Sequence, residues 1–262
     1  NQLVVEQWRG RLVALYGSTY ALSQLAGPLL LGVVGSEDDL GFWVGAGLLV
    51  VAPLALLGRS GAPVSESCSV TFNDLLGFCR RMPVIAWAIA LFAAFEAMIL
   101  TLLPVYCLQQ GFSTELALFM VSTVVVGDAL LQLPIGALAD RMSRRTLFSG
   151  CALTLLLSSL AIPLFMHTWM IWPLWVLFGA SAGGLFTLSL VLIGERYRDD
   201  ALVRANAHVA QLWGIGCLIG PLAAGAGSQW ISGHALPLLM AVGAAGLVLL
   251  ARRPNAFEPA PV

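Results

Sequence analysis

The stretch Gly136-Ala-Leu-Ala-Asp-Arg-Met-Ser-Arg-Arg145 places four charges within ten residues. It lies between two long apolar runs, in a chain of 262 residues of which 59% are hydrophobic and only 10% are charged. Soluble domains carry about 45–50% apolar and about 25% charged residues. The composition therefore predicts an all-α, polytopic integral membrane protein, because helices satisfy their own backbone hydrogen bonds in lipid.

Charged residues and short polar breaks divide the chain into runs that are long enough to cross a bilayer, which takes about 20 residues. One break falls at His167 and another between Ser228 and His234. We therefore expect eight transmembrane helices. They lie within residues 12–36, 40–58, 83–108, 116–139, 146–166, 170–194, 205–227 and 235–251.

The 13 basic residues are all arginines, and eight spans put every one of them on the same side of the membrane. The loops on the opposite side contain none. An excess of arginine and lysine marks the cytoplasmic side. Both ends of this chain are therefore expected in the cytoplasm.

Charge and cysteine usage give no sign of other chemistry. The net charge of −1 gives no reason to expect a nucleic-acid partner. The five cysteines are dispersed and contain no CxxC pair, so we expect apolar filler and neither a metal site nor a cofactor. They are Cys68, Cys79, Cys107, Cys151 and Cys217.

An internal repeat relates the first span to the seventh, at an offset of 193 residues. RLVALYGSTYALSQLAGPLLLG begins at Arg11, and RANAHVAQLWGIGCLIGPLAAG begins at Arg204. The shared glycine-proline pairs, which we expect to pack helices together, are Gly27-Pro28 and Gly220-Pro221. Repeated halves are typical of secondary transporters. The offset corresponds to about six spans, so we expect four helices before Asn1 that the chain lacks.

The opening stretch resembles the G-x-L-a-D-r-x-G-R-R signature of the major facilitator superfamily, with Ser143 in place of a glycine. Within that superfamily the chain is most similar to the YcaD-like branch. The stretches that carry this similarity are RGRLVALYGSTYALSQLAGPLL from Arg9, LLPVYCLQQGFS from Leu102 and PIGALADR from Pro134.

The resemblance implies a twelve-helix fold with two pseudo-symmetric six-helix halves, of which this chain holds helices five to twelve. Residues 1–58 would end the first half, 59–82 form a cytoplasmic loop, 83–251 form the second half and 252–262 a tail. It implies secondary transport of a small solute by alternating access in a bacterial inner membrane, and no enzyme activity.

The signature loop has two interpretations. The resemblance and the residue types favour a conformational latch that meets Arg11 at the start of the first span; its members are Gly136, Asp140, Arg141, Arg144 and Arg145. Alternatively, the loop is ordinary and its arginines only set topology.

Two acids lie inside predicted spans, at similar depth near the middle of the bilayer. They are Glu96, 13 residues after Pro83, and Asp128, 12 residues before Asp140. A carboxyl group is costly there and by default indicates function, so we expect proton-coupled transport. The alternative is that these acids hold helices together.

Other polar residues in the spans have two interpretations: they are expected either to line a cavity or to form hydrogen bonds between helices. They are Tyr20 and Gln24 in the first span, and His208 and Gln211 in the seventh.

Two other function classes stay open. Residues 179–183 (GASAG) formally match the G-x-S-x-G motif of serine hydrolases, but inside an apolar helix they favour close helix packing. The other class is a membrane sensor or assembly protein that transports nothing.

Overall fold

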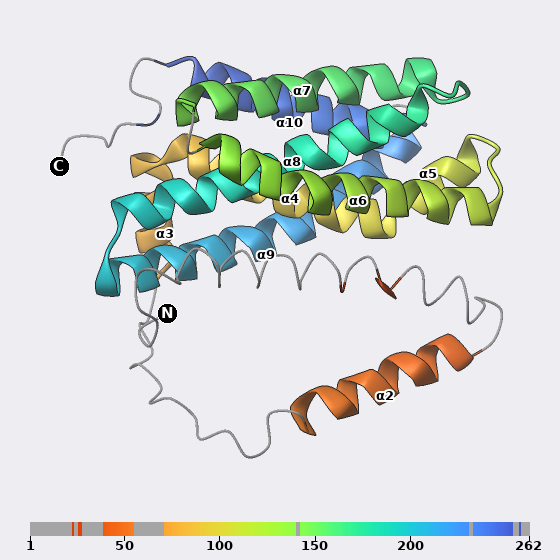
Figure 1. The fold of residues 1–262 in the computed structure, drawn as a ribbon, viewed down its shortest axis with the longest axis horizontal. Helices are drawn as coiled ribbons and strands as arrows, with labels where there is room; N and C mark the ends of the chain where they lie inside the picture. Colours follow the sequence, from red (N-terminus) through yellow and green to blue (C-terminus); the bar gives the residue numbers. More distant parts are fainter. Residues whose placement is uncertain are drawn as a thin grey trace.

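The computed structural model describes residues 23, 26, 27, 39–54, 71–139, 142–230, 233–253 and 257. The regular elements in these residues are all helices, which confirms the all-α prediction (Figure 1). They are α2 (Leu40–Leu54), α3 (Phe72–Arg81), α4 (Pro83–Thr101), α5 (Leu103–Gln109), α6 (Thr114–Ala139), α7 (Arg144–Phe165), α8 (Ile171–Arg196), α9 (Asp199–Trp230) and α10 (Ala235–Ala251).

Within the described part of the chain, four helices are long and apolar enough to cross a membrane: α4, α7, α8 and α9. Helix α10 and most of α2 are shorter apolar segments. The predicted first span lies almost entirely outside the described residues. The number of eight spans therefore stays a prediction.

Two helix boundaries differ from the prediction. The run 83–108 is two helices, because α4 ends at Thr101 and α5 begins after Leu102. Pro104 explains this break, since it has no backbone N–H to continue the ladder. The seventh span was expected to begin after Arg204, but α9 begins at Asp199. The helix dipole stabilises acidic residues in a first helical turn. Asp199 and Asp200 therefore belong to α9, and charged residues do not mark where this helix begins.

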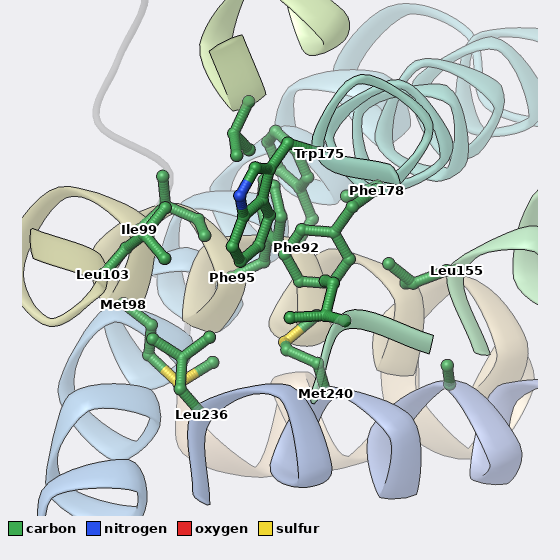
Figure 2. Packing of buried hydrophobic residues seen from close by; sticks show 14 of the residues in the cluster. Phe92, Phe95, Met98, Ile99, Leu103, Leu155, Trp175, Phe178, Leu236 and Met240 are labelled. Atoms are coloured by element: carbon green, nitrogen blue, oxygen red, sulfur yellow. The ribbon is translucent and has the colours of Figure 1, made fainter. Parts of the chain in front are cut away.

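The bundle is built from helix pairs: α4 packs against α9, α6 against α8, and α7 against both α8 and α10. Figure 1 shows these long helices running side by side. Figure 2 shows the interior, where Phe92, Phe95, Trp175 and Phe178 meet between helices. All four side chains are at most 4% exposed.

Glycines allow the closest helix approaches. A Cβ atom on Gly220 would lie 2.7 Å from the Cα atom of Ala94, so α9 and α4 touch backbone to backbone there, with Pro221 following inside α9. A Cβ atom added to Gly27 would have no neighbour within 4 Å, and Pro28 lies outside the described residues. The packing role of the Gly27-Pro28 pair therefore stays a prediction.

The outer surface of the helices is apolar, as lipid contact requires. Leu164 on α7, Leu222 on α9 and Leu249 on α10 are each at least 64% exposed. Phe42 and Trp43 on α2 are 76% and 67% exposed.

Candidate functional site

A small pocket between α4 and α6 contains both embedded acids. Glu96 comes from α4 and Asp128 from α6. The other lining residues are apolar: Phe95, Ile99, Leu100, Val124 and Val125. The pocket has room for about one water molecule. The two residues that sequence reasoning placed at similar depth thus share one site.

Close helix packing holds each acid in place. One turn before Asp128 on α6, the carbonyl of Val124 would meet any side chain added at Gly179 of α8. The backbone nitrogen of Asp128 would lie 3.0 Å from the same added atom. On α4, the carbonyl of Ala93 accepts a 3.6 Å hydrogen bond from the thiol of Cys217 on α9. The backbones that carry the acids are therefore fixed by α8 and α9.

Phe95 lines the pocket, and other aromatic rings pack together beside it on α4, α8 and α9. Phe92, one turn before Glu96, stacks on Phe186 with ring centroids 4.7 Å apart and meets Trp213 edge-on at 5.6 Å. Phe95 meets Phe178 edge-on at 5.1 Å. Glu96 itself is only 9% exposed.

The indole nitrogen of Trp175 is another buried polar atom, next to the ring of Phe178. Trp175 is fully buried in α8, and within the described residues its Nε1–H has no hydrogen-bond partner. Its ring meets Phe178 edge-on at 5.7 Å. Sequence reasoning missed this residue, because tryptophan in an apolar span gives no signal of an unpaired donor.

The other predicted cavity residues are placed differently. His208 is 7% exposed, shares a hydrogen bond with Gln211 at 3.1 Å, and packs its ring on Phe78 of α3 at 5.3 Å. The hydrogen bond lies within α9, and the ring contact with Phe78 joins α9 to α3, so the cavity-lining and interhelical interpretations both stay predictions. Tyr20 and Gln24 lie outside the described residues.

The described part of the signature loop joins three helices. Arg144 at the start of α7 forms an ion pair with Glu195 at the end of α8. Arg145 donates a 3.2 Å hydrogen bond to the carbonyl of Arg253, just after α10. The sequence did not indicate Glu195 or the Arg253 carbonyl as partners of these arginines.

The remaining members of the signature are only partly described. Gly136 lies within α6, while Asp140, Arg141 and Arg11 are outside the described residues. Ser143, at the glycine position of the signature, has φ −61° and accepts a 3.2 Å hydrogen bond from the Thr146 backbone. It therefore caps α7 in a conformation that needs no glycine.

A contact at the opposite end of the bundle was also missed. The hydroxyl of Tyr106 on α5 and Nδ1 of His234, next to α10, share a hydrogen bond of 2.9 Å. The sequence showed His234 only as a loop residue, because the pair is 128 positions apart.

The serine of the G-x-S-x-G stretch lies inside a helix. The Ser181 hydroxyl donates to the Phe178 carbonyl of the same helix at 3.1 Å and is 4% exposed. The described structure thus lacks the strand-turn-helix context of a nucleophile elbow at this position, and the arrangement favours helix packing.

Comparison with known families agrees with this architecture. The model of the Major Facilitator Superfamily matches residues 115–261. A Bacillus subtilis (strain 168) protein called "Uncharacterized MFS-type transporter YfkF" is 24% identical over 267 residues, covering 97% of this chain and 67% of the relative.

Two further relatives show the same relationship. The Yersinia enterocolitica protein "Uncharacterized MFS-type transporter YE1530" is 27% identical, covering 94% of this chain and 64% of its own length. The Escherichia fergusonii protein "Uncharacterized MFS-type transporter YcaD" is 28% identical, covering 81% of this chain and 55% of its own length. The resemblance to YcaD-type proteins is thus confirmed, and the chain spans 55–67% of these three relatives. This integral membrane protein belongs to the Major Facilitator Superfamily.

Proposed function

We propose that the full-length protein is a secondary transporter that moves a small solute by alternating access and couples the movement to protons. This chain would supply helices five to twelve of two six-helix halves. The 193-residue repeat supports that arrangement, as does the 55–67% coverage of the relatives. Rocking of the two halves about a central site is the general mechanism for repeats of this kind.

The observation that carries the proposal is the pocket shared by Glu96 and Asp128. Two acids from different helices face one small apolar space. A carboxyl group inside a membrane span by default indicates function, and a proton carrier needs such a group. Glu96, on the helix that also contacts α8 and α9, is the proposed coupling residue, and Asp128 its neighbour.

The charges of the site favour a neutral or cationic solute. The described arginines all lie near the ends of helices, in the ranges 80–81, 144–145, 196–204 and 252–253. A strongly anionic solute would therefore find no arginine of the described part of the chain at the depth of Glu96.

The signature contacts would act as the latch of the switch. The ion pair of Arg144 with Glu195 and the bond from Arg145 to the Arg253 carbonyl tie the same ends of α7, α8 and α10 together. Asp140 with Arg11 would extend these ties to the other half. In this proposal the arginine-rich ends face the cytoplasm of a bacterial cell, in keeping with the positive-inside rule.

Solute flux in proteoliposomes tests the proposal. The full-length protein is reconstituted, and uptake of a panel of neutral and cationic solutes is measured with a pH gradient imposed and then collapsed by an ionophore. At least one solute should accumulate only while the gradient is present, and empty liposomes give the baseline. Uptake that ignores the gradient would refute coupling. No flux for any solute would favour a sensor or assembly protein.

A further inference from the structure

The short helix α3 lies where the chain enters the membrane. Arg81 ends α3, and Pro83 begins α4, one of the four helices able to span a membrane. Figure 1 shows α3 at the end of the bundle where α8 joins α9. The helix is therefore at the level of the lipid headgroups.

One side of α3 is attached to the bundle. Leu75 and Phe78 are each 4% exposed. The ring of Phe78 lies 6.4 Å from that of Tyr197, just after α8, and 5.3 Å from that of His208 on α9. These contacts fix the rotation of α3 about its axis.

The apolar side of α3 extends beyond this attachment. Phe72 and Leu76 are 67% and 41% exposed. They lie one turn apart on the same face, and Arg80 follows one turn further on. Arg80 is exposed as well, whereas Arg81 donates a hydrogen bond to the carbonyl of Gly77 at 3.3 Å. An uncovered apolar edge thus borders an exposed guanidinium group.

The charge at this end of the bundle is complementary to an anionic surface. In the described residues it holds nine arginines and four carboxylates. The carboxylates are Asp74, Glu195, Asp199 and Asp200, of which Asp74 accepts hydrogen bonds from Thr71 and Glu195 pairs with Arg144. The opposite end, in the same described residues, holds the acids Asp39 and Glu115 and no arginine.

We propose that α3 is an interfacial helix that inserts Phe72 and Leu76 beneath the headgroups and binds the phosphate of an anionic phospholipid through Arg80. Amphipathic helices bind membranes through buried apolar area together with attraction to anionic lipids. Each arginine near such a surface adds a salt-sensitive attraction. The site would couple the packing of α3 on α8 and α9 to the lipid composition, independently of the transported solute.

Hydrogen exchange in nanodiscs tests this site. The full-length protein is placed in nanodiscs of phosphatidylcholine alone or with phosphatidylglycerol added, and exchange is followed in residues 72–81. We expect exchange to slow about fivefold with the anionic lipid, the effect of one arginine at such a surface. Arg80→Gln should remove most of this slowing, while the matched variant Arg252→Gln, at the end of α10, should retain it.

Three outcomes would overturn the proposal. The first is equal exchange of α3 in both lipids for the wild-type protein, a comparison that needs no variant. The second is full slowing in Arg80→Gln, with exchange in α8 confirming that the variant is folded. The third is equal slowing by inorganic phosphate in phosphatidylcholine nanodiscs, which would indicate a soluble-anion site instead of a lipid site.

Discussion

The contact between α9 and α4 gives the sharpest prediction about stability, because it is made by backbone atoms. In Gly220→Ala the new Cβ atom would lie 2.7 Å from both Cα and Cβ of Ala94 and 2.9 Å from its carbonyl oxygen. Carbon atoms prefer separations of about 3.5–4.0 Å, so the two helices must separate by roughly 1 Å. Overpacking of this kind costs about 1–3 kcal/mol of unfolding free energy.

The assay is thermal unfolding of the full-length protein in detergent, followed with a thiol-reactive dye. Cys107 and Cys151 are 0% and 8% exposed, so they react when the bundle opens. A loss of 1–3 kcal/mol corresponds to a fall in Tm of roughly 2–12 °C, at about 2–4 °C for each kcal/mol. Gly225→Ala, on the same helix with no neighbour within 4 Å, is the matched control and should not lower the Tm. Equal Tm values for the two variants would refute the close-contact argument.

Glu195→Gln removes the ion pair with Arg144; because the side chains are 48% and 29% exposed, we expect unfolding free energy to change by less than about 1 kcal/mol. Solute flux should nevertheless fall severalfold, and unchanged flux would argue against the latch. Tyr106→Phe removes the 2.9 Å bond to His234 and should cost about 1 kcal/mol, measured as a lower Tm; an unchanged Tm would show that the bond does not stabilise the fold. The hydrogen bond from the threonine hydroxyl before α3 holds the pKa of Asp74 below its usual 3.8. The stabilising effect of this hydrogen bond is thus complete above the pKa that Asp74 has in the unfolded chain, and it is lost as the pH falls through the lower pKa of the folded protein. Pepsin cleavage within α3, normalised to an unstructured peptide, should rise with acidity in wild type and stay constant in Asp74→Asn; parallel profiles would contradict this.

Features that depend on chain composition could be predicted from the sequence. The long apolar runs gave the helical class, and the run 235–251 coincides with α10 because a polar loop precedes it and arginines follow it. The shared depth of Glu96 and Asp128 followed from counting residues along two antiparallel helices. The structure adds that both line one pocket.

Features that depend on distant partners could not be predicted. The partner of Arg144 is Glu195, 51 positions away, and nothing local to either residue indicates the other. Ser143 appeared to be a departure from the signature, although its side chain is a good cap for α7. The placement of His208 against Phe78 depends on how α3 folds back onto α9, which periodicity does not encode.

Proton movement driven by solute in proteoliposomes most directly tests the central claim that Glu96 carries the coupling proton. The full-length protein is reconstituted with a pH-sensitive dye inside, and a solute that the wild type transports is added outside. We predict that wild type and Glu115→Gln, whose acid lies at the exposed start of α6, move protons with the solute, while Glu96→Gln moves none. Undiminished proton movement in Glu96→Gln would contradict the account.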